Sequence, residues 1–277
     1  MPKSLAIIAF CVAFLLGVAW VSGPAMVPLA VASMLVQWTA FVPAYLSPPE
    51  RYYDITGTFT YLLLLSLALM WGSLDARSLL LAAMVLVWAV RLGTFLFRRI
   101  QREGKDGRFD DIKPDPGRFA VAWTLQGVWV FLTAIAALIA IVAPAGPELG
   151  GRDLVGLLLW GGGFGLEVMA DTQKTAFRAD PAHEGRFIDT GVWAWSRHPN
   201  YAGEITLWTG VLVLASSSFT QPGQWVALVS PVFIYLLLTR VSGVPMLEKR
   251  SDARWGGQPD YEAYKARTPV LWPRPPR

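Results

Sequence analysis

Long apolar segments separated by short polar ones make up most of the chain. Eight segments have the composition of membrane helices: residues 4–21, 26–46, 58–71, 79–97, 119–142, 154–170, 205–216 and 225–238. About 20 apolar residues suffice to cross the hydrocarbon core as an α-helix, whereas barrel strands are shorter and alternate in polarity. Backbone groups inside lipid must be hydrogen-bonded within the protein. The pattern therefore predicts an all-α, polytopic membrane bundle.

The first apolar segment leaves the number of membrane spans at seven or eight. Residues 4–21 follow Lys3, and a signal peptide is the alternative interpretation. The small-residue pattern of a cleavage site is weak and another apolar segment follows at once, so we interpret 4–21 as a membrane helix. We expect one membrane domain, 1–277, in which the N-terminal helices (1–46) precede a core of residues 47–277.

Basic residues are unevenly distributed among the polar segments. Residues 98–118, 173–197 and 240–277 carry most of the Lys and Arg, and the links at 22–25, 74–78, 143–152 and 217–224 carry few. Positive loops stay on the cytoplasmic side. We therefore expect an integral membrane protein with both termini in the cytoplasm. Residues 47–57 fall on the same side.

The sequence offers little for metal binding. It contains two histidines and one cysteine, Cys11, which lies within an apolar segment. Structural metal sites need several such ligands together, and a disulfide needs a second cysteine. We expect no metal, no disulfide and no nucleic-acid partner, whereas membrane lipid is an expected partner.

Glycines interrupt the sixth apolar segment at 161–163 and 165. Small residues let membrane helices approach closely. A dinucleotide-binding glycine loop follows a strand, and no strand is expected here. We therefore expect these glycines to serve helix packing rather than phosphate binding.

Charged side chains mark the end of the sixth span and the segment that follows it. On a helix, spacings of four, three and four residues put four of them on one face: Glu167, Asp171, Lys174 and Arg178. A salt-bridged helix end is the simpler interpretation. Charges near a span are costly and usually functional, however. The alternative is a polar wall whose acids accept hydrogen bonds from ribose or amide groups and whose cations bind phosphates.

The segment 189–204, DTGVWAWSRHPNYAGE, is the densest polar and aromatic stretch of the chain. It precedes the seventh span and contains six candidate ligand-binding residues: Trp195, Arg197, His198, Asn200, Tyr201 and Glu204. A capped helix start with Asn200 as N-cap is the simpler interpretation. A helix N-terminus at this place would also favour an anion.

Two further segments hold candidate residues. The basic C-terminal tail contains Tyr264 and Arg267 and either contacts anionic lipid or closes over a cofactor. Residues 47–57, SPPERYYDITG, contain Glu50 and Tyr53 ahead of the third span. These are an interfacial anchor or a substrate-facing acid, because a tyrosine hydroxyl can donate a hydrogen bond to a carbonyl.

Three motifs together resemble the steroid 5α-reductase family in its bacterial branch. They are GLEVMADTQKTAFR, GRFIDTGVWAWSRHPNYAGEITLWTG and YEAYKARTPVLWP. The resemblance covers about residue 51 to the C-terminus, and it implies a location in a bacterial inner membrane. It implies an all-helical membrane oxidoreductase that uses NADPH to reduce the C4–C5 double bond of a 3-oxo-Δ4-steroid or a similar lipophilic enone.

The resemblance also suggests roles for individual residues. Asp171 matches an acid of the family, and Asn200, Tyr201, Gly203 and Glu204 match its N-[FY]-x-G-E motif. Arg267 matches a basic residue of the last conserved segment. Glu167 and Trp195 stand where animal members have asparagine and tyrosine. These positions enclose NADPH in the family.

The family's catalytic pair is a glutamate before one span and a tyrosine in the next. Glu50 is the candidate glutamate, but residues 79–97 contain no tyrosine. Tyr53 or another hydroxyl is then expected to act as the proton donor.

Two other functions remain open. Isoprenylcysteine carboxyl methyltransferases and phospholipid methyltransferases have a similar R-H-P-x-Y-x-G pattern and a later glutamate, and would bind S-adenosylmethionine. A lipid-binding membrane protein would bind neither cofactor. Residues 171–178 favour NADPH, because cations there suit a ligand with several phosphates.

Overall fold

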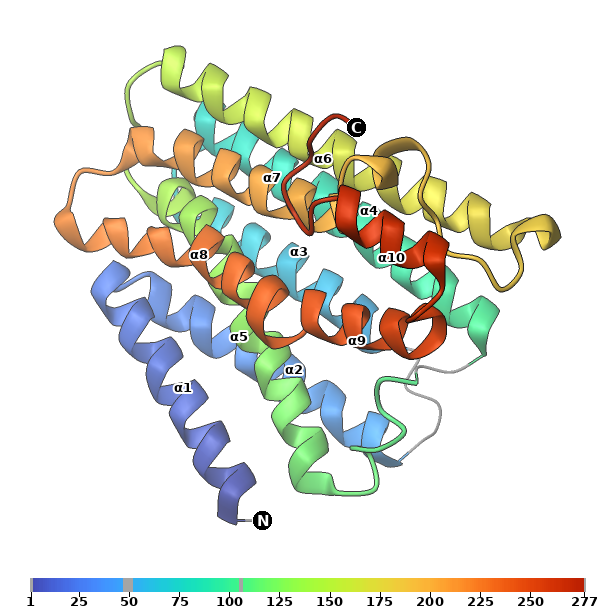
Figure 1. Cartoon of the computed structure of the whole chain (residues 1–277). Helices are drawn as coiled ribbons and strands as arrows, with labels where there is room; N and C mark the ends of the chain where they lie inside the picture. The colour runs from blue at the N-terminus through green and yellow to red at the C-terminus, as the bar shows by residue number, and fades with distance from the viewer. Residues whose placement is uncertain (1, 47–51, 105–106, 277) are drawn as a thin grey trace. The chain divides into compact units, whose positions relative to one another are not determined.

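The computed structural model describes residues 2–46, 52–104 and 107–276. Within these ranges the regular elements are α-helices, short 3-10 helices and one π-helical turn, without a β-strand (Figure 1). Seven of the described helices are long and apolar enough to cross a membrane. The prediction of an all-α integral membrane protein is confirmed.

The chain divides into two compact units. Unit 1 comprises Met1–Asp153 and Val211–Ser230, and unit 2 comprises Leu154–Gly210 and Pro231–Arg277. We describe each unit by itself. The expectation that the whole chain forms one domain stays a prediction.

Unit 1 is built around helix α5. Its helices are α1 (Pro2–Ser22), α2 (Met26–Leu46), α3 (Tyr53–Trp71), α4 (Ala76–Glu103) and α5 (Pro116–Val142), with 3-10 turns η3 (Ser216–Ser218) and η4 (Pro222–Leu228). Helix α5 packs against α1, α2, α3 and α4. In its apolar stretch of 18 residues, 83% of the residues are buried. A helix surrounded by others must be apolar on every face, which explains why residues 119–142 carry so few polar side chains.

Helix α4 is longer than the sequence pattern predicts. It starts behind the N-cap Asp75, whose carboxylate accepts a hydrogen bond from Ser78 N at 2.8 Å, and ends at Gly104 with a φ of 80°. The apolar pattern ended at residue 97. Arg98, Arg99 and Arg102 therefore lie on the last turns of a helix and not in a polar link. Their positive charges there interact favourably with the negative end of the helix dipole.

Unit 2 contains most of the polar segments. It contains all or most of the following elements: α6 (Gly151–Ala179), η1 (Pro181–His183), η2 (Gly191–Ala194), α7 (Pro199–Ala215), α8 (Val229–Leu236), the π-helical turn η5 (Leu237–Val241), α9 (Val244–Trp255) and α10 (Pro259–Arg267). Helix α7 has 17 residues. The eighth predicted span, 225–238, is part of a longer helical stretch from Pro222 to Trp255. The start of the predicted tail is thus helical.

Helices α6 and α7 approach each other at glycines. A Cβ atom on Gly203 would lie 2.6 Å from Gly163 O and 2.8 Å from Glu167 N, and one on Gly210 would lie 2.5 Å from Trp160 N. Close packing is thus confirmed for Gly163. It does not apply to Gly161, Gly162 and Gly165, around which a Cβ would meet no heavy atom within 4 Å.

Gly203→Ala is therefore expected to lower the free energy of unfolding by about 1–2 kcal/mol, because the added methyl group collides with backbone atoms that cannot rotate away. The matched control is Gly161→Ala, which places the same methyl group in open space on α6. Thermal unfolding in detergent measures both. Equal melting temperatures for the two variants would contradict the close approach.

Candidate functional site

The α6–α7 contact brings two predicted site residues together. Asn200 Nδ2 donates a hydrogen bond to Asp171 Oδ1 over 3.4 Å, a long distance for such a bond. Asp171 and Glu167, one turn apart on α6, are 7% and 3% exposed. Glu204 lies one turn beyond Asn200 on α7 and is half-buried. Buried carboxylates at a span end are costly unless they have partners, which marks this contact as a functional candidate.

The interpretation of Asn200 as an N-cap is wrong. Helix α7 begins at Pro199, and the amide of Ala202 donates to His198 O. Asn200 therefore lies in the first turn. Its side chain faces α6, where it contacts Asp171.

Next to this pair, α9 supplies a carboxylate that bonds two residues of the RHPNY motif. Glu248 Oε1 lies 2.8 Å from His198 Nε2, and Glu248 Oε2 lies 2.9 Å from Arg197 Nη1. The ring of Tyr201 stacks on the His198 imidazole with centroids 5.6 Å apart and an interplanar angle of 8°. Glu248 was not among the predicted site residues, and no spacing in the sequence links it to His198.

The surroundings of His198 favour its neutral form. Its side chain is 5% exposed, and this burial lowers the pKa of the imidazole. Glu248 raises this pKa, while Lys174 and Arg197 lower it further. The pKa of His198 is therefore lowered overall. With Nε2 donating to the carboxylate, Nδ1 is an acceptor. Nδ1 is buried and has no hydrogen-bond partner in the part of the chain that the structure describes.

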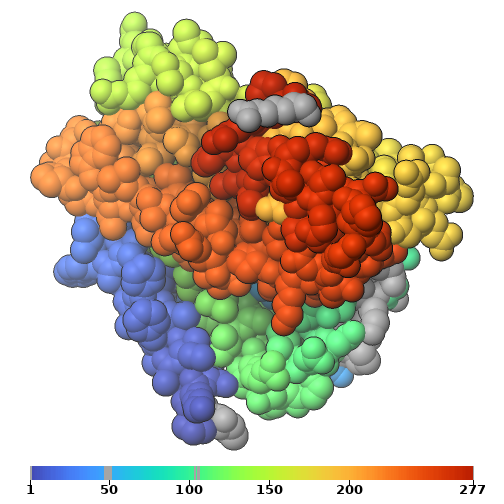
Figure 2. Space-filling model, in the orientation of Figure 1, coloured from blue at the N-terminus to red at the C-terminus, as the bar shows by residue number. Residues whose placement is uncertain are grey.

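The end of the chain folds back on the segment before α7. Tyr264 of α10 donates to Trp193 O over 2.8 Å, and Arg267 pairs with Asp189 at 3.1 Å. Burial raises the pKa of the Tyr264 hydroxyl, so this group stays protonated as a donor. Figure 2 shows α10 and the chain end, in red, against the golden atoms of the segment that precedes α7. Tyr264 and Arg267 thus hold the tail in place over residues 189–196.

The other predicted cofactor residues occupy different surroundings. The Lys174 ammonium lies over the Trp193 ring, 4.4 Å from its centroid. Arg178, one turn further along α6, is exposed, and Trp195 is 44% exposed. Among the described residues no group of three or more His, Cys, Asp or Glu could hold a metal ion.

The candidate catalytic residues belong to unit 1. Glu50 lies outside the described residues. Tyr53 donates its hydroxyl to Ala122 O over 3.0 Å, and its ring packs against Phe109 and Trp123 with centroids 4.8 and 5.1 Å away. The hydroxyl must leave this carbonyl before it can donate to a substrate.

A small polar pocket lies between α3, α4 and α5, within unit 1. It has a volume of about 30 Å³ and is lined by Asp54, Thr58, Tyr61, Trp88, Ala89, Leu92, Gly93, Leu96, Gln126 and Trp129. The Asp54 carboxylate also pairs with Arg108 at 2.7 Å. We did not predict this pocket, because its polar residues come from two helices, α3 and α5, and no spacing in the sequence brings them together.

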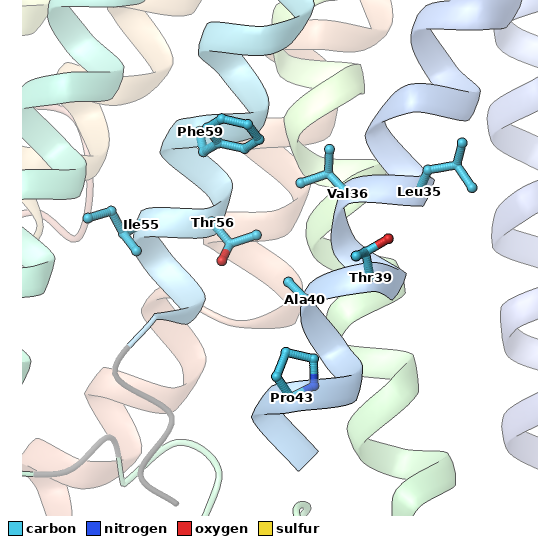
Figure 3. Close-up of a pocket in the computed structure, with 8 residues that line it drawn as sticks. All are labelled: Leu35, Val36, Thr39, Ala40, Pro43, Ile55, Thr56 and Phe59. Carbon is cyan, nitrogen blue, oxygen red and sulfur yellow. The ribbon is translucent and has the colours of Figure 1, made fainter. Parts of the chain in front are cut away.

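A larger, apolar groove lies between α2 and α3 of the same unit. Its volume is about 560 Å³, and Figure 3 shows Thr56 and Phe59 of α3 facing Val36 and Ala40 of α2. Sites for drug-sized ligands have about 300–1,000 Å³ and mostly apolar linings. The groove therefore has the size and character to hold an apolar molecule.

Comparisons with known proteins place the chain in a family but give it no activity. It is similar to an uncharacterized protein of Schizosaccharomyces pombe, with 24% identity over 257 residues that cover 82% of this chain and 72% of the yeast protein. No solved structure matches. The profile of a family described as a protein of unknown function, DUF1295, matches residues 40–268. The chain therefore belongs to the DUF1295 family.

Proposed function

We propose that the protein is an NADPH-dependent oxidoreductase that reduces the carbon–carbon double bond of a lipophilic enone. The observation that carries this proposal is the polar cluster of unit 2. There Asn200 of α7 bonds Asp171 of α6, and Arg197 and His198, which immediately precede α7, bond Glu248 of α9. Their placement supports the resemblance to steroid 5α-reductases.

The donors and acceptors of this cluster fit a phosphorylated dinucleotide. Carboxylates of Asp171 and Glu167 can accept hydrogen bonds from ribose hydroxyl or carboxamide groups, and the buried His198 Nδ1 is a further acceptor. Lys174 and Arg178 lie one and two turns further along α6 and are the candidates for phosphate contacts. NADPH would supply a hydride for the carbon β to the substrate carbonyl.

Unit 1 offers a place for an apolar substrate body. The groove between α2 and α3 is lined almost entirely by apolar side chains and lies on helices of membrane-spanning length. A steroid-like enone dissolved in the bilayer could enter it without crossing water. Glu50 and Tyr53 remain the proposed residues that polarise the carbonyl. The orientation with the cofactor residues in the bacterial cytoplasm is likewise a proposal, based on the positive loops.

The alternative proposal is an S-adenosylmethionine-dependent methyltransferase. One observation favours it: Glu248 bonds both Arg197 and His198. Joining the R-H-P pattern to a later glutamate is the arrangement that the methyltransferase resemblance implies.

Thermal shifts with NADPH, NADH and S-adenosylmethionine separate these functions. A ligand at a hundred times its dissociation constant stabilises the folded protein by about 2.7 kcal/mol. Stabilisation by NADPH, followed by its consumption with testosterone as the enone, supports the reductase. Stabilisation by S-adenosylmethionine alone would replace it with the methyltransferase, and no shift with any of the three would favour a lipid-binding protein.

Asn200→Ala is expected to weaken NADPH binding by about 1–3 kcal/mol, because a buried partner then loses its hydrogen bond. Thr206→Ala is the matched control, since the Thr206 hydroxyl bonds only Ala202 O of its own helix among the contacts described. Titration of NADPH against each variant gives the dissociation constants. An unchanged constant for Asn200→Ala would remove this residue from the cofactor site.

A further inference from the structure

One residue that lines the polar pocket of unit 1 has a side-chain oxygen without a partner in the described structure. Gln126, on the mainly apolar helix α5, is 4% exposed. Its Nε2 donates to Tyr53 O over 2.8 Å. Its Oε1 is buried and has no hydrogen-bond partner among the residues that the structure describes. A buried polar atom left unpaired costs about 1–3 kcal/mol, so a ligand that pairs with it gains a corresponding preference.

The orientation of the Gln126 amide is fixed by its surroundings. Exchanging its nitrogen and oxygen would put two carbonyl oxygens 2.8 Å apart, since Tyr53 O can only accept. A Cβ atom on Gly57 would lie 2.7 Å from Nε2, so the glycine is what admits the amide group beside α3. The unpaired atom is therefore an acceptor.

The hydroxyl groups around the pocket direct their hydrogens elsewhere. Thr58 bonds Asp54 O and Ala89 O at 3.3 and 3.4 Å. Tyr61 bonds the Thr133 hydroxyl, which itself donates to Trp129 O, so Tyr61 is the donor in that contact. Asp54 contributes a carboxylate, which also accepts. These side chains present acceptors to a guest, and a guest that carries a hydrogen-bond donor suits them.

The size of the pocket limits the guest to a small group. About 30 Å³ is available, and about 10–15 Å³ is enough for one water-sized group. Tyr61 packs edge-on against Trp88 and Trp129 with centroids 5.4 and 5.6 Å away, so three aromatic rings form part of the wall. A terminal hydroxyl fits this space, and a ring does not.

We propose that this pocket takes the terminal hydroxyl of an apolar substrate, and that Gln126 selects a hydrogen-bond donor over an acceptor at that position. The proposal rests on the proposed reduction of a lipophilic enone and narrows its substrate class to hydroxylated molecules. The hydroxyl end of such a molecule would bind between α3, α4 and α5, and not in the α2–α3 groove, which is lined by the opposite face of α3. A ketone at the same place would put its oxygen against Gln126 Oε1, with no hydrogen between them.

The test compares two enones that differ in a single functional group. Testosterone carries a hydroxyl where androstenedione carries a ketone, and their enone rings are identical. We expect wild-type kcat/KM with NADPH to favour testosterone by roughly 10-fold or more, which is the range of one buried hydrogen bond. Gln126→Leu and the unbranched Gln126→Met are expected to abolish that preference.

Gln37→Leu is the matched control. Gln37 of α2 is also fully buried, donates its Nε2 to α3 through Thr60 at 2.8 Å and has an unpaired Oε1 within the described structure, but it does not line the pocket. This variant is expected to keep the preference for testosterone. A preference lost equally in Gln37→Leu and Gln126→Leu would reduce Gln126 to a packing residue and overturn the proposal.

Equilibrium binding without NADPH separates this inference from the proposed reaction. The radiolabelled steroids and a second pair, farnesol and farnesal, are bound to wild-type protein and to both Gln126 variants. A Gln126-dependent preference for the alcohols, with no NADPH consumed, would end the reductase proposal and leave the hydroxyl pocket standing. Reduction of both steroids with equal efficiency would support the reductase proposal and overturn the hydroxyl pocket. Equal binding within both pairs, or no binding at all, means that the pocket holds water only and overturns the inference.

Discussion

Replacing Arg77 with alanine is expected to lower the free energy of unfolding by about 3–5 kcal/mol, the usual cost of removing one partner of a buried ion pair. The side chains of Arg77 and Asp153 are 2% and 5% exposed, and two hydrogen bonds of 2.7 and 3.0 Å join them. Arg77 also donates to Pro147 O and Glu148 O. Alanine would leave the Asp153 charge buried, with Gly150 N as its remaining described backbone donor.

A double variant distinguishes the charge from the packing. In Arg77→Leu/Asp153→Leu no charge remains, and apolar replacement of a buried pair is often neutral or better. The double variant should therefore have a higher melting temperature than Arg77→Ala. It should be less stable than wild type only because the hydrogen bonds to the carbonyls of residues 147 and 148 are lost. Melting temperatures in detergent measure this. A double variant less stable than Arg77→Ala would show that the pair contributes through geometry rather than through charge compensation.

The positions of the long helices and part of their packing could be predicted from the sequence. Apolar runs located every long helix, because lipid leaves few other backbone structures. The glycines at 161–163 also indicated a close helix contact, and Gly163 makes it. We did not predict which glycine faces α7, although Gly163 precedes Glu167 by one turn and so lies on the face that Glu167 shares with Asp171.

The candidate site was only partly predictable for a different reason. Asp171 was chosen from the helical spacing of charges and Asn200 from the dense polar segment before the seventh span, both with support from the family resemblance, and the structure places them in contact. Glu248 follows His198 by 50 positions, so its role depends on how α9 returns to α7. Gln126 lies in a long apolar run that also contains Thr124 and Thr133, and nothing in that run indicates that three helices meet around Gln126.

Glu248→Ala is expected to destabilise the protein by about 3 kcal/mol. The change leaves the buried His198 Nε2 and the half-buried Arg197 without the acceptor that the structure gives them, and bonds to charged groups contribute about 1.5–3 kcal/mol each. The expected loss is smaller than the sum of the two bonds, because the Glu248 side chain is 23% exposed and water can replace part of the lost hydrogen bonding. Glu248→Gln, which keeps one acceptor oxygen, should lose about half as much in thermal unfolding. Equal losses for the two variants would contradict separate bonds to the two partners.

The pH dependence of these variants tests the electrostatics of His198 directly. Burial holds the folded-state pKa of His198 below its unfolded value of about 6.5. Its contribution to stability is therefore complete above about pH 6.5 and falls by about 1.4 kcal/mol per pH unit below it, until the folded-state pKa is reached. Glu248→Ala removes the group that raises this pKa and leaves Lys174 and Arg197, which lower it.

The decline of stability in Glu248→Ala should consequently continue to lower pH than in wild type, whereas His198→Gln should lose this part of the dependence altogether. Unfolding free energies measured between pH 7.5 and 4.5 give the three curves. Parallel curves for wild type and Glu248→Ala would show that the carboxylate does not set the protonation of His198, and the tautomer that leaves Nδ1 as an acceptor would lose its support.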